Sequence, residues 1–218
     1  MKTALIVVDA QNDFMPGGSL AVPNGNLIIP VINQITRCTP FDLIVFTKDS
    51  HPKDHLSFAS QHDDKKPFDG VVLSGINDTV WPDHCVQDTF GCEINSSIIT
   101  DIDSVGASRV SVINKGVTRD EISYSGFFDN TGSISTGLDT MLAENKIERV
   151  YVCGLAMDYC VFWTAKDAVK LGYDTYIVLD ATAPIKPFND ALSELLTWTC
   201  EINGKKIMFA MSGGIELC

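Results

Sequence analysis

Residues 148–172, ERVYVCGLAMDYCVFWTAKDAVKLG, carry the clearest structural signal in the chain because two apolar patterns meet in them. Residues 149–154 form a short apolar run without clean alternation, which is typical of a strand covered on both faces. From 161 to 171 the apolar residues recur at helical spacing, and Gly172 follows where a helix is expected to end. The stretch predicts a strand followed at once by a helix, the repeating unit of a parallel α/β sheet.

Five more apolar runs resemble that strand, and helical patterns lie between most of them. We predict strands at 4–8, 42–47, 109–114, 149–154, 175–180 and 206–211, and helices within 27–35, 138–142, 161–171 and 192–198. Alternating strands and helices favour an α/β fold with a doubly wound parallel sheet. A length of 218 residues suits one domain, so we expect a single domain over 1–218.

The chain is acidic, with 16 basic and 28 acidic residues and a net charge of -12. Proteins that neutralise phosphates are basic, so we expect no nucleic-acid partner, and no polybasic run suggests a membrane surface. No stretch approaches the roughly 20 apolar residues that cross a bilayer, and we interpret the apolar run after Met1 as a strand rather than a secretory signal. Seven cysteines, an odd number without a tight spacing pattern, favour free thiols and a cytoplasmic location.

Residues 49–90 show no clear period, and so long an irregular stretch in a compact domain is usually functional. In extended chain Asp49 and His51 point to the same side, and a carboxylate with an imidazole at a strand end suits a divalent metal such as zinc. His84 would complete three protein ligands of an open, catalytic type of site. The alternative is a chance cluster of histidines in a polar surface loop. We expect His62 to be a solvated surface residue, and His55 to be a further ligand, a supporting residue or a surface residue.

Three reactive side chains follow three of the predicted strands: Asp9, Lys115 and Cys160. The carboxyl ends of parallel strands meet at one crevice, so these side chains are expected to meet there. An acid/base, a cation and a thiol are the groups that acyl transfer through a thioester uses. We expect Asp158 to cap the helix that Cys160 begins, the helix dipole and Lys115 to favour the thiolate, and Asp9 to take the thiol proton. The alternative is a buried, inert cysteine at a strand–helix turn.

Six short motifs connect this chain to a known family. They are LIVVDAQNDF at 5–14, FTKDSHPKDHLSFA at 46–59, WPDHC at 81–85, INKG at 113–116, YSGF at 124–127 and VCGLAMDYCV at 152–161. With this combination over nearly its whole length, the chain resembles the isochorismatase-like cysteine hydrolases, and within them the nicotinamidases. The resemblance implies a three-layer α/β/α, Rossmann-like fold around a six-stranded parallel sheet.

The resemblance also implies the roles of the reactive residues. Asp9, Lys115 and Cys160 would form the catalytic triad. One divalent metal ion, most often zinc, would bind the ligand set Asp49, His51 and His84, with His55 and Ser57 as the nearest candidates for a fourth ligand.

The same resemblance implies a cis peptide bond between Leu155 and Ala156 and an oxyanion hole formed by the amides of Ala156 and Cys160. The pyridine pocket would be lined by Phe14, Leu20, Trp81, Tyr124 and Tyr159. For each of these five side chains the alternative is ordinary core packing.

The activity implied by the resemblance is that of an amidohydrolase. It would convert nicotinamide, and also pyrazinamide, to the acid and ammonia through a cysteine thioester, as a step in NAD salvage; a homo-oligomer is compatible with this interpretation. The nearest rival is a sibling amidase for a carbamoyl or ureido substrate, against which the histidine-containing stretch argues. A nucleotide-binding Rossmann module is disfavoured because DAQND, not G-x-G-x-x-G, follows the first predicted strand. A non-catalytic scaffold would leave the triad unexplained.

Overall fold

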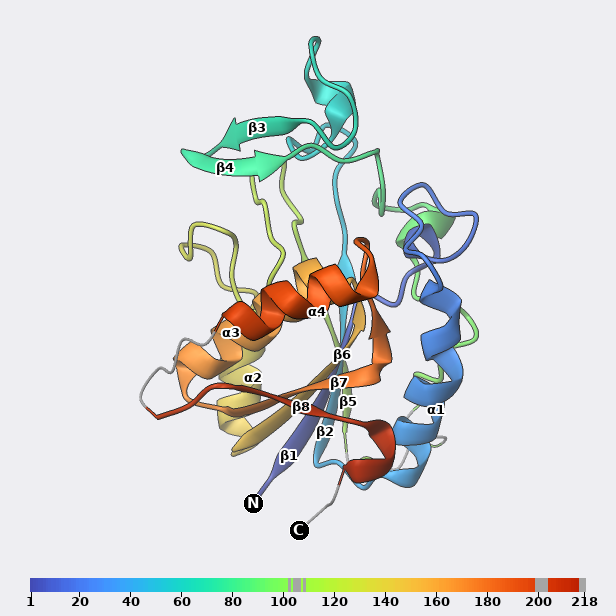
Figure 1. Ribbon diagram of the computed structural model, residues 1–218, viewed down its shortest axis with the longest axis vertical. Coiled ribbons are helices and arrows are strands. Elements are labelled where there is room, and N and C mark those ends of the chain that lie inside the picture. Colours follow the sequence, from blue (N-terminus) through green and yellow to red (C-terminus); the bar gives the residue numbers. More distant parts are fainter. Residues whose placement is uncertain (102, 104–106, 108, 199–203, 216–218) are drawn as a thin grey trace.

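The computed structural model describes residues 1–101, 103, 107, 109–198 and 204–215 (Figure 1). Its centre is a six-stranded sheet in the order β5-β2-β1-β6-β7-β8, with every neighbouring pair parallel. The strands are β1 Thr3–Val8, β2 Leu43–Asp49, β5 Val110–Lys115, β6 Arg149–Leu155, β7 Asp174–Ala183 and β8 Ile207–Ala210. The prediction of a parallel α/β sheet is therefore confirmed.

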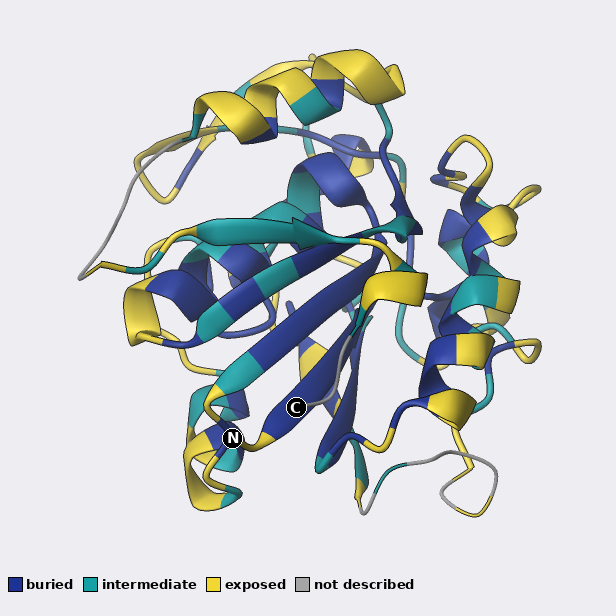
Figure 2. Cartoon of the chain, turned by 60° about the horizontal axis from the view of Figure 1, so that its bottom comes forward, coloured by how far each residue is buried: buried dark blue, intermediate teal, exposed yellow. Residues whose placement is uncertain are grey.

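Helices cover both faces of this sheet, which makes three layers (Figure 1). They are α1 Ile28–Cys38, α2 Leu138–Glu144, α3 Phe162–Leu171 and α4 Phe188–Thr197. Alternate residues of β1 serve opposite layers: Leu5 and Val7 pack in the core that contains α1, whereas Ile6 packs in the core that contains the other three helices. Figure 2 shows the result, with buried strands inside and the exposed residues on the outer faces of the helices.

The strand order brings the reactive residues to one edge of the sheet. β1, β2, β5 and β6 are neighbours, and the residues at or just past their carboxyl ends are Asp9, Asp49, Lys115 and Leu155. Asp49 and Lys115 are register partners across β2 and β5. The crevice of an open parallel sheet thus collects a carboxylate pair, an ammonium and the turn that carries Cys160.

The stretch 49–90, which showed no period in the sequence, contains regular structure after all. β3 Gly70–Leu73 and β4 Ile76–Thr79 form an antiparallel hairpin away from the main sheet (Figure 1). Its two-residue turn, Ser74 and Gly75, has positive φ at both positions, as primed hairpin turns require. Most hairpin residues are exposed or half-buried, so they carry no alternating apolar pattern. Among the described residues, no helix is both long and apolar enough to cross a bilayer.

Candidate active site

Lys115 connects the other two residues of the predicted triad, Asp9 and Cys160. Its Nζ lies 2.9 Å from Asp9 Oδ2, 3.5 Å from Cys160 Sγ and 2.5 Å from Asp49 Oδ1. It also donates to the carbonyl of Ser123 at 3.0 Å. Lys115 and Asp9 are fully buried. The two carboxylates compensate the buried positive charge of Lys115. The same ammonium group contacts both Asp9 and Cys160, which keeps these two side chains close together.

The protonation states follow from burial and from these charges. Burial raises the pKa of Asp9, and Lys115 only partly offsets this effect. Burial opposes the charge of Lys115, yet Asp49 and Asp9 raise its pKa well above the ordinary range, so Lys115 is an ammonium. Asp9 Oδ2 makes its ion pair with Lys115 but no hydrogen bond of regular geometry among the described residues, which leaves an acceptor position on a carboxylate made more basic by burial.

Lys115 favours the thiolate of Cys160, as expected, but burial opposes it and has the larger effect. Burial raises the pKa of Cys160 well above its usual value, although Lys115 acts in the opposite direction. Cys160 is therefore a thiol rather than a thiolate in this structure. Its sulfur and one oxygen each of Asp9 and Asp49 lie within 4.8 Å of one another, so a carboxylate stands ready to take that proton.

The turn that carries Cys160 is a short π-helical segment, Met157–Val161, between β6 and α3. Ala156, not Asp158, is its N-cap, so the predicted capping role of Asp158 was wrong. Instead, the Asp158 carboxylate accepts hydrogen bonds from the amides of Ile185 at 2.9 Å and Lys186 at 3.0 Å, which ties the turn to the loop after β7. The Leu155–Ala156 bond is cis, as predicted. An oxyanion hole from the amides of Ala156 and Cys160 stays a prediction.

Asp49, His51 and His84 come together as a cluster that suits a metal ion. Asp49 Oδ2 lies 3.7 Å from His51 Nε2 and 3.9 Å from His84 Nε2. The other ring nitrogens point away: Nδ1 of His51 donates to the carbonyl of Gly116 at 2.8 Å, and Nδ1 of His84 donates to that of Pro82 at 2.7 Å. These contacts assign both protons to Nδ1 and leave both Nε2 lone pairs beside the carboxylate, as metal-binding histidines require.

Electrostatics favour the same protonation pattern. Burial, with the neighbouring His51, lowers the pKa of His84 to about 4, so its imidazole is neutral. Although burial opposes its charge, Lys115 and His51 lower the pKa of Asp49, so it is a carboxylate. A neutral imidazole and a carboxylate are the states that ligate metals. The donor set therefore fits a divalent ion of the kind predicted.

His55 supports the cluster without joining it. Its ring stacks on His51 with centroids 4.1 Å apart, Nδ1 lies 2.7 Å from Ser57 Oγ, and Nε2 lies 3.1 Å from the Glu121 carbonyl. Both of its ring nitrogens are thus engaged, and Ser57 Oγ is engaged with it. Of the alternatives that the sequence left open, the structure favours a supporting role. His62 is half-buried and contacts the Leu56 carbonyl at 2.9 Å.

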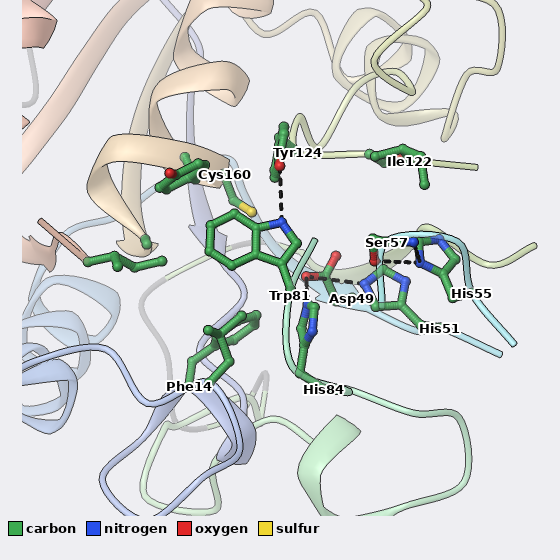
Figure 3. A pocket seen from close by; sticks show the side chains of 15 residues that line it. Phe14, Asp49, His51, His55, Ser57, Trp81, His84, Ile122, Tyr124 and Cys160 are labelled. Carbon is green, nitrogen blue, oxygen red and sulfur yellow. Dashed lines mark hydrogen bonds and ion pairs between the residues drawn. The ribbon is translucent and has the colours of Figure 1, made fainter. Parts of the chain in front are cut away.

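One cavity contains the thiol, the candidate metal cluster of Asp49, His51 and His84, and the predicted pocket residues (Figure 3). Phe14, Leu20, Trp81, Tyr124 and Tyr159 all line it. The ring of Trp81 meets that of Tyr159 edge to face, with centroids 4.9 Å apart, and Tyr124 lies 5.5 Å from Tyr159. These rings give an apolar wall to a cavity whose polar groups are the thiol and the Asp49 cluster. Such a combination suits a small, planar ligand with a polar end.

Comparison with known proteins identifies the family. Residues 114–193 match the isochorismatase domain model. A nicotinamidase from Acinetobacter baylyi is 46% identical over 182 residues, 84% of this chain and 81% of that protein. The solved yeast nicotinamidase bound to the inhibitor nicotinaldehyde is 32% identical, with TM-score 0.81 and coverage of 95% and 100%.

This chain belongs to the nicotinamidases. Another solved relative, the pyrazinamidase of Pyrococcus horikoshii in complex with zinc, is 37% identical, with TM-score 0.73 and coverage of 97% of this chain and 99% of that chain. Together with the Asp49, His51 and His84 cluster, this likeness supports a metal ion in the present nicotinamidase.

The sequence analysis missed Gln11 as part of the nicotinamidase site. Its fully buried amide donates to the carbonyls of Asp49 at 2.7 Å and Cys92 at 2.8 Å, and it accepts from the Asp49 amide at 2.8 Å. Gln11 thereby clamps the backbone of Asp49 between the triad and the histidines. The signal was a long polar side chain two residues after Asp9, inside a motif already singled out.

Proposed function

We propose that this chain hydrolyses nicotinamide to nicotinate and ammonia through a thioester on Cys160, a step of NAD salvage. The observation that carries the proposal is the contact of Lys115 with Asp9, Asp49 and Cys160 next to an aromatic cavity. A thiol, a buried carboxylate of raised pKa and a fixed ammonium are the groups that covalent amide hydrolysis needs.

In this mechanism Asp9 removes the proton from the Cys160 thiol as the sulfur attacks the carboxamide carbon. Lys115 stabilises the negative charge that moves from Asp9 to the sulfur and the substrate. The amides of Ala156 and Cys160 are our candidates for receiving the carbonyl oxygen as it becomes an oxyanion. Asp9 then returns the proton to the leaving nitrogen, the carbon–nitrogen bond breaks, and ammonia departs.

The second half regenerates the thiol. Asp9 takes a proton from a water molecule, whose oxygen attacks the thioester carbonyl. The carbon–sulfur bond breaks, the proton on Asp9 returns to Cys160, and nicotinic acid leaves and releases its proton to solvent as nicotinate. Trp81, Tyr124 and Tyr159 would bury the ring and limit the access of bulk water during both steps.

Asp49, His51 and His84 would hold the metal ion, and we propose zinc because one carboxylate oxygen and two imidazole nitrogens suit it. When bound, zinc would supply an electrophilic coordination position for a pyridine nitrogen. We also propose a cytoplasmic location, supported by the free cysteines Cys38, Cys85, Cys92, Cys153 and Cys160.

The test compares nicotinamide, pyrazinamide and benzamide as substrates of the metal-loaded protein by ammonia release. A site built around a polar contact rejects an analogue without that contact more strongly than one of slightly different size. We expect kcat/KM for benzamide to be lower by at least about a hundredfold than that for nicotinamide, with pyrazinamide hydrolysed as well. Equal values for benzamide and nicotinamide would mean that the ring nitrogen is not recognised. Turnover of a carbamoyl or ureido compound, with none of nicotinamide, would assign the chain to a sibling amidase activity.

A further inference from the structure

The hairpin β3–β4 reaches the wall of the substrate cavity through one side chain. Asp78, on β4, accepts a hydrogen bond from the Tyr124 hydroxyl on Oδ1 at 2.5 Å and another from Asn130 Nδ2 on Oδ2 at 3.0 Å. The Tyr124 hydroxyl in turn accepts a hydrogen bond from Trp81 Nε1 at 3.1 Å (Figure 3). Hydrogen bonds to a carboxylate are stronger than neutral ones, so Asp78 anchors this chain of contacts.

Asn130 completes the connection on the side of the loop. The side-chain Oδ1 of Asn130 accepts a hydrogen bond from the Tyr124 backbone amide at 3.1 Å, and the backbone amide of Asn130 donates to the Ile122 carbonyl at 2.7 Å. Burial and the adjacent Asp78 raise the pKa of Tyr124, so its hydroxyl remains protonated and can act as the donor. The Tyr124 side chain and backbone are therefore both tied to the pair formed by Asp78 and Asn130.

This network determines how two rings stand in the cavity. Trp81 and Tyr124 meet edge to face at 86° with centroids 6.5 Å apart, and each also contacts Tyr159. A tyrosine hydroxyl that donates to one partner and accepts from another fixes its ring against sliding in its plane. Rings held in place before binding lose less freedom when a ligand enters, which favours affinity for a ligand of matching shape.

We propose that Asp78 is a positioning residue that sets substrate specificity by holding Tyr124 and Trp81 as the walls of a slot for a planar aromatic amide. The proposal rests on the nicotinamidase activity proposed above. Asp78 itself does not line the cavity, and it acts through Tyr124. Loss of Asp78 should therefore weaken substrate binding while leaving the chemistry at Cys160 intact.

The decisive experiment replaces Asp78 by asparagine and then restores its hydrogen bond to residue 130 by a second substitution at Asn130. In Asp78→Asn, the new side chain can still accept from Tyr124, but its amide group then faces Nδ2 of Asn130, donor against donor. We expect KM for nicotinamide to rise about tenfold, the factor that accompanies loss of one hydrogen bond to a charged group, with kcat within about twofold of wild type. The double variant Asp78→Asn/Asn130→Asp exchanges donor and acceptor and should bring KM back to within about threefold of wild type.

Two further variants separate this role from a general effect on folding. Asp64→Asn also removes one negative charge, but from an exposed position in the stretch 49–90, and it should leave KM and kcat unchanged. Tyr124→Phe keeps the ring but removes its hydroxyl, and should raise KM like Asp78→Asn. Thermal unfolding of each variant reports whether it is folded, and if Asp78→Asn unfolds, Tyr124→Phe carries the test.

The outcomes are distinct. A wild-type protein that does not release ammonia from nicotinamide would overturn the proposed function, and this inference with it. An active wild type with an unchanged KM in folded Asp78→Asn, or in Tyr124→Phe, would overturn the inference alone. So would an equal fall of kcat and kcat/KM, since that pattern places Asp78 in the chemical step. Failure of a folded double variant to recover KM would also overturn it, because the pairing with Asn130 would then not be what matters.

Discussion

Lys115 and Asp49 are in direct contact, with Nζ 2.5 Å from Oδ1, while Oδ2 of the same carboxylate faces the ring nitrogens of His51 and His84. One carboxylate therefore contacts both the ammonium beside the Cys160 thiol and the two imidazoles of the candidate metal site. A metal ion on Oδ2 would compete with Lys115 for the charge of Asp49, so the two halves of the site are coupled electrostatically. Gln11, whose side chain makes two hydrogen bonds to the Asp49 backbone, is buried beside this carboxylate and fixes the backbone that carries it.

Replacing Cys160 by alanine should abolish turnover while leaving the fold intact. The substitution deletes the atom that forms the covalent intermediate, so we expect ammonia release from nicotinamide to fall by at least about a thousandfold. Cys160→Ser should be nearly inactive too, because a serine hydroxyl gives up its proton to Asp9 far less readily than a thiol. Thermal unfolding checks that both variants are folded. Near-normal ammonia release by Cys160→Ala would refute the thioester mechanism.

Purified protein should contain about one divalent ion per chain, and His51→Ala should lose both the ion and the activity. The reason is that His51 supplies one of the three donor atoms in the cluster. His62→Ala is the matched control, since His62 contacts the Leu56 carbonyl and should retain the metal. Elemental analysis gives the metal content directly. Full metal content in His51→Ala, or full activity after chelation, would contradict the assignment of the site.

Gly116→Ala should disturb the metal cluster through a steric effect on His51. Gly116 has φ +62°, and an added Cβ would lie 2.4 Å from His51 Cε1. Gly132→Ala is the control: Gly132 has φ +75°, but no atom lies within 4 Å of an added Cβ, so that variant should lose only about 1–2 kcal/mol from backbone strain. We expect Gly116→Ala to lose more stability than the control and, unlike it, to bind zinc less tightly. Urea unfolding measures the stability of each variant, and zinc titration measures its affinity for the metal. Equal stability and equal zinc affinity of the two variants would show that a side chain at position 116 does not displace His51.

The metal-free protein should lose stability as the pH falls from about 6.5 towards about 4. Burial lowers the pKa of His84 to about 4 and that of His55 to about 3, from an ordinary value of 6.5. In this window the unfolded chain binds protons that the folded chain does not, so the free energy of unfolding decreases on acidification. His84→Gln should show a shallower decrease between pH 6.5 and 5, whereas His62→Gln should follow wild type. Urea unfolding at several pH values tests this, and identical slopes for wild type and His84→Gln would exclude the effect.

Local patterns were enough to predict the strands of the main sheet, the α-helices and the residues at the strand ends. An apolar run such as 149–154 or a helical spacing such as 161–171 is a property of neighbouring residues, so its signal survives without the fold. The topology of a parallel sheet then required Asp9, Lys115 and Cys160 to converge. The hairpin at 70–79 was not predicted from the sequence because its residues are largely exposed and show no alternation of apolar and polar residues. Its only local signal is the turn at Ser74 and Gly75.

The motifs along the chain were thus enough to indicate which residues form the site. They did not indicate the protonation state of these residues or their hydrogen-bond partners. Whether Cys160 rests as a thiol or a thiolate depends on how far the fold removes it from water, and burial decided for the thiol. Asp158 is a residue type that often caps a helix. In the fold, however, its carboxylate accepts hydrogen bonds from amides of the loop after β7. Asp78 and Tyr124 are 46 positions apart, and nothing local links them. Burial and long-range hydrogen bonds arise only when distant segments pack, which is why the tertiary structure alone could assign them.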